Sequence, residues 1–201
     1  MTLEALERSR LGVGDTLTEP RRHHLLNADA DVRVRDAALN LVAHRARTRA
    51  ELRRRLRLRG FDPARIDLCL GRLEERGLID DATVAAAFVR DRLRQRPRGR
   101  SRLVAELRAK GLTAELAAAA IDGVFDDEEV SDRALALEVA ERWVARQGMS
   151  TLQALAQRAR SAERDKVHRR LRGYLTRRGF RGEALRDATD RAVERAREAM
   201  G

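Results

Sequence analysis

The segment TRAELRRRLRLRGF, residues 48–61, carries the signals of one complete short helix. Thr48 and Glu51 have the spacing of a capping box, in which the two side chains satisfy free backbone N–H groups at a helix start. Leu52 and Leu56, four residues apart, then lie on the same face of the helix. Because this apolar stripe is narrow, the helix has to pack against other helices.

The helix is predicted to end at Gly60, because glycine readily adopts the left-handed conformation that closes a helix. Phe61 can then fold back as the hydrophobic contact of that cap. The same spacing of two leucines, a glycine and a large apolar residue occurs twice more in the sequence. The later copies are Leu103, Leu107, Gly111 and Leu112, and then Leu171, Leu175, Gly179 and Phe180. Three matches at one spacing indicate an internal repeat.

Each repeat is predicted to contain a leading, a middle and a closing helix. The expected helices cover 36–46, 49–59 and 63–76 in the first copy, 82–95, 101–110 and 114–124 in the second, and 132–146, 164–178 and 183–198 in the third. The third glycine follows the second at a longer interval than the second follows the first, which predicts an inserted segment. The predicted domains are a mobile or loosely docked tail over 1–34, repeats over 35–79, 80–126 and 127–201, and an insertion in the third repeat near 148–161.

The composition favours helices over sheets, since only 3 Pro and 3% aromatic residues accompany many Ala, Leu, Arg and Glu. No stretch of the sequence has the pattern of a strand. Because a three-helix unit of this size cannot bury its apolar face alone, neighbouring units are expected to stack. The predicted fold is all-α, with three tandem three-helix repeats stacked into an elongated, curved solenoid-like body.

The protein is strongly basic, with a net charge of +11, and all but two of its 43 basic residues are arginines. A high-GC genome accounts for much of the preference for arginine over lysine. It does not explain why the acidic residues are fewer than the basic ones. We therefore expect a negatively charged partner, and phosphate backbones are the commonest. Cys69, the one cysteine, fits a reducing cytosol, and no apolar run approaches the roughly 18 residues of a membrane span. A cytoplasmic monomer that does not enter a membrane is predicted.

The usual catalytic arrangements are missing from the sequence, so we expect no enzymatic activity, no cofactor and no metal. Neither lysine follows a glycine, as a phosphate-binding P-loop requires, and the histidines lack metal-ligand spacing. Asp80, Asp81 and the acidic run 126–129 could hold Mg²⁺ for nuclease chemistry. Each group precedes a predicted helix, however, where carboxylates commonly cap free N–H groups. Cys69 lies on an apolar stripe and is expected to be a core residue.

Basic density is the strongest functional signal. Residues 90–110 contain nine basic side chains against Asp91 and Glu106, and the helix over 49–59 is nearly as basic. The planar guanidinium pairs bidentately with phosphate or carboxylate, so these segments suit a nucleic-acid backbone or an acidic protein surface. An ordinary solvated face is the alternative interpretation, but the loop 95–100 has every second residue basic and no helical partners for them. The predicted contact residues are Arg53, Arg54, Arg57, Arg94, Arg98, Arg100 and Arg102.

These segments resemble the RecX family of regulatory proteins, which act on the bacterial recombinase RecA. The resemblance covers about 36–193, and Val84 departs from it by standing where an aromatic residue is common in the family. It rests on ALNLVAHRARTRAELRRRLRLRGF (38–61) and RLEERGLIDD (72–81) in the first repeat, AFVRDRL (87–93) and GRSRLVAELRAKGL (99–112) in the second, and RRLRGYLTRRGF (169–180) in the third.

The resemblance implies a non-enzymatic regulator that binds RecA filaments on single-stranded DNA and lowers RecA ATPase, strand exchange and co-protease activity in recombination and DNA repair. Contact with DNA is expected through its backbone, because aromatic residues hardly accompany the arginines. Two alternatives stay open. A helix-turn-helix transcriptional regulator could use residues 36–76, although it would need only one such unit. A small nuclease would have to act through the acidic groups named above.

Overall fold

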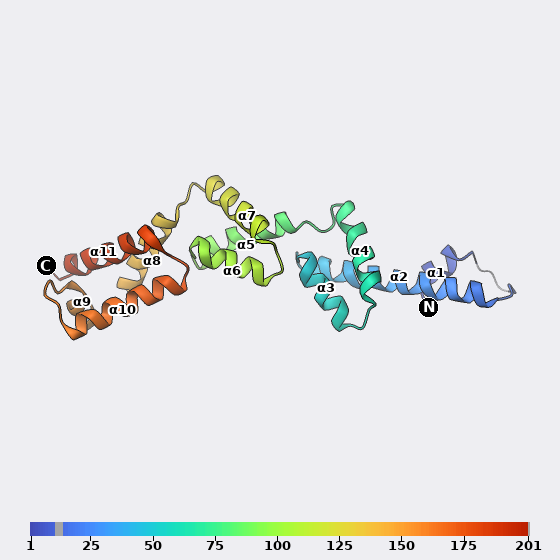
Figure 1. The fold of residues 1–201 in the computed structure, drawn as a ribbon, viewed down its shortest axis with the longest axis horizontal. Coiled ribbons are helices and arrows are strands. Elements are labelled where there is room, and N and C mark those ends of the chain that lie inside the picture. The colour runs from blue at the N-terminus through green and yellow to red at the C-terminus, as the bar shows by residue number, and fades with distance from the viewer. Residues whose placement is uncertain (11–13, 201) are drawn as a thin grey trace. The chain divides into compact units, whose positions relative to one another are not determined.

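The computed structural model of the protein describes residues 1–10 and 14–200. Over these residues the chain is helical and contains no strand, as the sequence predicts. It divides into two compact units, residues 1–84 and 85–201, and each is described here by itself (Figure 1). None of the described helices combines the length and the apolar character needed to cross a bilayer.

The first unit contains four helices: α1 (Leu3–Arg8), α2 (Glu19–His44), α3 (Arg49–Leu58) and α4 (Pro63–Glu75). The last three are the leading, middle and closing helices of the first repeat. Their inner faces form one core of fully or nearly buried side chains, which includes Ala38, Leu41, Leu52, Leu56, Ile66, Leu70 and Leu73. The first repeat therefore has a hydrophobic core of its own.

The caps of α3 are those expected from residues 48–61. Thr48 accepts a hydrogen bond from the backbone N–H of Glu51, and the Glu51 side chain returns to the backbone of Thr48. Gly60 has a φ of 82°, and the N–H of Phe61 donates to the carbonyl of Leu56 at 3.3 Å. The same arrangement closes the other two middle helices, at Gly111 with a φ of 88° and at Gly179 with a φ of 94°.

The structure differs from the sequence expectation over residues 1–34. The leading helix of the first repeat starts at Glu19, not near residue 36, and α1 docks against its first half. Ala5 of α1 is completely buried, and the backbone N–H of Thr2 donates to the Asp29 carboxylate. Within this segment α1 and the part of α2 from Leu25 onward are packed, whereas residues 14–24 are exposed.

The reason is visible in the buried face of α2. Leu25, Asp29 and Val32 lie on it one turn apart, and the buried carboxylate interrupts the apolar pattern. Because Asp29 finds its partner on α1, the contact has no signature in the local sequence. Arg35 and Glu4 form a bidentate ion pair across the same two helices.

The second unit contains the second and third repeats. Its helices are α5 (Asp81–Gln95, which starts just before the unit boundary), α6 (Arg100–Ala109), α7 (Ala114–Asp127), α8 (Asp132–Val144), α9 (Met149–Ala156), α10 (Ala162–Arg177) and α11 (Gly182–Glu198). The short helix α9 occupies the position of the predicted insertion. We keep 35–79, 80–126 and 127–201 as the proposed boundaries of the repeats.

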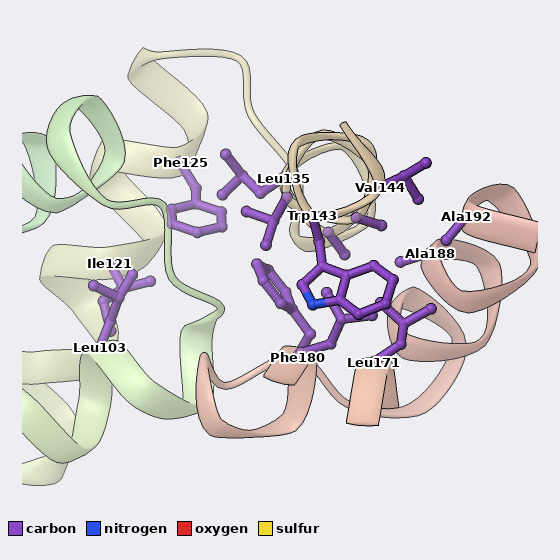
Figure 2. Close-up of a cluster of buried hydrophobic side chains, with 14 of the residues drawn as sticks. Leu103, Ile121, Phe125, Leu135, Trp143, Val144, Leu171, Phe180, Ala188 and Ala192 are labelled. Carbon is purple, nitrogen blue, oxygen red and sulfur yellow. The ribbon is translucent and has the colours of Figure 1, made fainter. Parts of the chain in front are cut away.

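The second and third repeats share one continuous core, so these two repeats stack as expected. Every helix from α5 to α11 contributes to it, and Figure 2 shows Phe125 of α7, Trp143 of α8, Leu171 of α10 and Phe180 within it. Phe125 and Phe180 are 1% and 0% exposed. The hydrophobic contact of the third glycine cap, Phe180, is therefore also a central core residue.

Two glycines bring the second and third repeats into backbone contact. The N–H of Gly99 donates to the carbonyl of Arg178 at 2.8 Å, and the Ser101 hydroxyl donates to the carbonyl of Gly179 at 2.8 Å. A Cβ atom on Gly99 would lie 2.6 Å from the Gly179 carbonyl oxygen. Only glycine fits at this position, because the neighbouring atoms belong to backbone and cannot rotate away.

A carboxylate at the start of one repeat caps the middle helix of the repeat before it. Asp81, the first residue of α5, accepts a hydrogen bond from the backbone N–H of Arg49 at 2.8 Å. Asp132, the first residue of α8, accepts one from the N–H of Arg100 at 2.9 Å. Both N–H groups stand at the first position of a helix, where no intrahelical partner exists. The same kind of tie therefore occurs once in each compact unit.

Candidate functional site

The predicted contact residues of the first unit lie on the exposed face of α3. Arg53 pairs with Asp67 of α4 at 2.7 Å. Arg54 and Arg57 are exposed and have no carboxylate partner among the described residues. Together with the 81% exposed side chain of Leu58, they border an open, shallow hollow of about 550 Å³. This face therefore presents free guanidinium groups around an exposed leucine, and we call it the α3 face.

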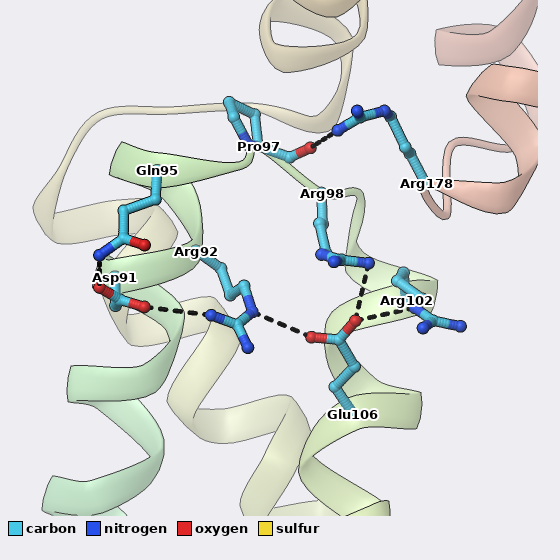
Figure 3. Close-up of polar contacts among 8 residues, drawn as sticks. All are labelled: Asp91, Arg92, Gln95, Pro97, Arg98, Arg102, Glu106 and Arg178. Atoms are coloured by element: carbon cyan, nitrogen blue, oxygen red, sulfur yellow. Dashed lines mark hydrogen bonds and ion pairs between the residues drawn. The ribbon is translucent and has the colours of Figure 1, made fainter.

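The basic segment between α5 and α6 is organised around one acid (Figure 3). Glu106 of α6 is 16% exposed and accepts hydrogen bonds from Arg92 and Arg102 at 3.1 and 2.8 Å. Arg98 lies 2.8 Å from the same carboxylate. Burial opposes ionisation of Glu106, but the hydrogen bonds from Arg102 and Arg92 and the charge of Arg98 lower its pKa below the ordinary range.

Arg98 is the most constrained of the predicted contact residues. Its side chain is 21% exposed, and its Nε atom is buried without a hydrogen-bond partner. Burial lowers the pKa of Arg98, and the neighbouring charges of Arg102, Arg92 and Arg178 act in the same direction against Glu106. A guanidinium in such a setting still has hydrogen-bonding capacity to offer to an anion.

Arg100 has an acidic partner, whereas Arg94 has none among the described residues. The Arg100 guanidinium pairs with Asp122 and lies over the Phe125 ring, 4.4 Å from its centroid. Arg94 is exposed, its Nε donates to the carbonyl of Arg90 at 3.4 Å, and no described carboxylate pairs with it. Among the predicted contact residues, Arg54, Arg57 and Arg94 are therefore the ones without an acidic partner in the described chain.

The expectation that the arginines of the loop 95–100 lack partners needs correction. Arg98 and Arg100 pair with Glu106 and Asp122, which lie 8 and 22 residues further along the sequence. Pairing between helices cannot be recognised from spacing along one helix. The Arg100–Asp122 pair is exposed and contributes little stability, so it does not prevent contact with a stronger anionic partner.

The acidic groups considered for Mg²⁺ have structural partners. Asp80 caps α5 by accepting hydrogen bonds from the N–H groups of Ala82 and Thr83. The run 126–129 spans the end of α7 and the turn before α8, whose N-cap is Ser131, and two of its acids pair with Arg90. Among the residues that the structure describes, no group of three His, Cys, Asp or Glu side chains is arranged to hold a metal ion.

Cys69 packs against the core of the first unit and is half-buried. Burial raises the pKa of its thiol, which reduces the thiolate fraction available for nucleophilic chemistry. The sequence interpretation of Cys69 as a packing residue agrees with this position.

Six arginines, of which the sequence analysis selected only Arg98, gather in the second unit. They surround a cavity of about 480 Å³, which we call the arginine hollow, formed by the α5–α6 loop, α8 and α10. Its lining contains Arg96, Arg98, Arg142, Arg146, Arg177 and Arg178. Arg96 and Arg98 belong to the loop 95–100, whereas Arg142 with Arg146 and Arg177 with Arg178 form two pairs far from it in the sequence. Only the packing of the third repeat on the second brings them together.

Comparison with known proteins places these features in a family. A family model described as the first three-helix domain of RecX matches residues 35–73, and one described as its second three-helix domain matches residues 80–121. The regulatory protein RecX of Halorhodospira halophila is 38% identical over 161 residues, which cover 80% of this chain and 89% of the relative. The chain belongs to the RecX family. The RecX protein of Amycolatopsis mediterranei is 34% identical over 148 residues, 74% of this chain and 76% of the relative.

Solved RecX structures have the same fold. A crystal structure of a regulatory protein RecX superposes with a TM-score of 0.69 at 20% identity, and covers 92% of this chain and 84% of its own. The crystal structure of RecX from Lactobacillus salivarius gives a TM-score of 0.63 at 20% identity, and covers 83% and 98%. Members of the RecX family are named regulatory proteins, in agreement with a chain in which sequence analysis finds no catalytic arrangement.

Proposed function

We propose that this chain is a non-enzymatic regulator that binds RecA filaments on single-stranded DNA and lowers their ATPase, strand-exchange and co-protease activities. The observation that carries the proposal is membership of the RecX family across 80% of the chain. RecA and its DNA are found in the cytoplasm, and the proposal places this chain there as well.

The charge distribution supports a partner of this kind. The DNA of such a filament carries phosphates, and a protein of net charge +11 is attracted to them. On the α3 face, Arg54 and Arg57 form no ion pair with an acid of the described chain. No such pair therefore has to break before they bind a phosphate or carboxylate. The exposed Leu58 beside them offers apolar area to a protein surface.

The test is RecA ATPase on single-stranded DNA, measured with substoichiometric amounts of this protein. We expect the ATPase rate to fall, and the Arg54→Glu/Arg57→Glu variant to inhibit at least about tenfold less well because two attractive charges become repulsive. The matched control is Arg158→Glu/Arg160→Glu, which makes the same change in net charge at exposed residues of a loop outside the α3 face.

The outcomes separate the function from its site. A wild-type protein that leaves RecA ATPase unchanged at every ratio contradicts the proposed function. Equal inhibition by both charge-reversal variants removes the α3 face from the proposal and leaves the function in place. Sequence-specific duplex binding, with no effect on RecA, would favour the alternative of a transcriptional regulator.

A further inference from the structure

The arginine hollow combines high positive charge with a lining free of acids. None of the residues around the cavity of about 480 Å³ is an aspartate or a glutamate. The volume is within the range of small-ligand sites in proteins, roughly 300–1,000 Å³. Such a concentration of like charge on a concave surface raises the local potential and attracts anions.

Four of these six arginines have no acidic partner among the described residues. Arg98 pairs with Glu106 and Arg142 with Glu138, and both acids lie outside the lining. Arg178 contacts the Tyr174 ring and the Pro97 carbonyl and no carboxylate, and the other three without a carboxylate partner in the described chain are Arg96, Arg146 and Arg177. All three side chains are exposed, so a ligand can reach them without unfolding any element.

The floor of the hollow is fixed by the junction of the two repeats. Arg178 lies over the Tyr174 ring, 4.5 Å from its centroid, and its Nη1 reaches the Pro97 carbonyl at 3.5 Å. Its own carbonyl accepts the N–H of Gly99 at 2.8 Å. These contacts hold the α5–α6 loop against the end of α10 (Figure 3). A cationic site that is already ordered loses little conformational entropy when it binds.

Holding these charges together has an electrostatic cost in the free protein. Burial is the largest cause that lowers the pKa of Arg98, and among the lining arginines Arg178 adds to it. An anion in the hollow would offset this repulsion.

We propose that the arginine hollow binds consecutive phosphates of a single-stranded nucleic-acid backbone. A flexible single strand can turn several phosphates into one concave site, whereas duplex DNA is stiff over roughly 150 base pairs and its phosphates face outward. An acidic peptide would need apolar anchor pockets, and the apolar lining is limited to Pro97, Val139 and a tyrosine ring already covered by Arg178. Arginine forks match phosphate oxygens bidentately. The choice of DNA over RNA rests on the proposed function.

The experiment measures binding of a fluorescein-labelled oligothymidine by fluorescence anisotropy, with the full chain and without RecA. The test variant is Arg96→Gln/Arg146→Gln/Arg177→Gln, and the matched control is Arg158→Gln/Arg160→Gln/Arg186→Gln, which removes the same charge from exposed residues of the same unit. We expect the test variant to bind about tenfold or more weakly and its salt slope to fall by about 2, since each phosphate contact contributes roughly 0.7. The control should bind within about twofold of wild type.

Other anions serve as competitors and identify the chemistry. Polyglutamate that competes as well as oligothymidine, and loses this ability in the test variant, would replace the phosphate assignment with an acidic protein segment. Duplex DNA that depends equally on the hollow would overturn the single-strand assignment. Equal affinity of the test variant and the control would overturn the site itself. If the triple variant unfolds, the single substitution Arg146→Glu at an exposed residue repeats the comparison.

Failure of this site and failure of the proposed function give different results. Loss of oligothymidine binding with intact inhibition of RecA would leave a DNA site that regulation does not need. Hollow-dependent binding by a protein that has no effect on RecA would retain the site and reject the proposed function.

Discussion

The junction between the second and third repeats provides the sharpest test of the fold. In a Gly99→Ala variant, the new Cβ atom would lie 2.6 Å from the Gly179 oxygen, 2.7 Å from the Gly179 carbonyl carbon and 2.9 Å from Cδ1 of Phe180. Ordinary carbon contacts are about 3.5–4.0 Å, so the two backbones must separate by roughly 1 Å. Phe180 is fully buried and cannot yield easily.

The expected cost combines overpacking with weakened hydrogen bonds. Overpacking a tight contact costs about 1–3 kcal/mol. Separation of the backbones also stretches the bonds from Gly99 to Arg178 and from Ser101 to Gly179, each worth about 1 kcal/mol. We therefore expect Gly99→Ala to lower the free energy of unfolding of the second unit by about 2–4 kcal/mol through the junction alone.

Gly148 provides a matched control for this substitution. Both glycines are N-cap residues without a side-chain cap, with φ and ψ of −72° and 160° at Gly99 and −77° and 162° at Gly148. No atom lies within 4 Å of a Cβ placed on Gly148. Gly148→Ala therefore measures the loss of glycine at an N-cap, up to about 1 kcal/mol, without the steric clash.

The assay is urea unfolding followed by the fluorescence of Trp143, the one tryptophan of the chain. It is 6% exposed and lies in the core of the second unit, so its signal reports that unit. Gly99→Ala should lower the midpoint far more than Gly148→Ala. If the two variants unfold with free energies within about 0.5 kcal/mol of each other, the close approach of Gly99 and Gly179 is not a feature of the folded protein.

Two carboxylates of the second unit give further predictions in the same Trp143 assay. Glu106→Gln should lower the free energy of unfolding by about 2 kcal/mol at pH 7, because charge-assisted hydrogen bonds from arginines are lost. The pKa of Glu106 is below its ordinary value of 4.5. The stability that ionised Glu106 contributes is therefore complete above pH 4.5 and is lost as the pH falls through the lowered pKa. A difference in unfolding free energy between Glu106→Gln and wild type that persists at pH 2 would contradict this account. Asp132→Ala should cost about 2 kcal/mol, because the N–H of Arg100 loses its acceptor, whereas Asp132→Asn keeps an acceptor oxygen. Burial raises the pKa of Asp132 above 3.8, so wild-type stability falls relative to Asp132→Asn as the pH rises through that window, and a constant difference from pH 3 to pH 7 would refute the assignment.

The middle helices were predictable because their signals are local. The sequence predicts 49–59, 101–110 and 164–178, and the structure has Arg49–Leu58, Arg100–Ala109 and Ala162–Arg177. A capping box and a glycine cap each involve atoms within a few residues of the helix end, so their geometry hardly depends on the rest of the fold. The leading helix α2 was mislocated because its first half is stabilised by contacts with α1.

The candidate site was only partly predictable, for the same reason. Composition identified the basic segments, and Arg54, Arg57 and Arg94 are indeed free of acidic partners in the described chain. The partners of Arg98 and Arg100 lie on other helical turns or helices, beyond the reach of any i, i+4 rule. The arginine hollow draws its lining from segments as far apart as the α5–α6 loop and α10.

The sequence by itself determined the helical class, the three repeats, the glycine caps and the excess of arginine, because each depends on residue type and spacing over a single helix. Only the tertiary structure explains why the N-cap of the middle helix is Gly99 in the second repeat, where the first repeat has Thr48. There a third repeat packs against the backbone, and a Cβ atom would collide with Gly179. It also decided which arginines are free and which converge, because charges separated by many residues meet only when the apolar faces of neighbouring repeats are buried against each other.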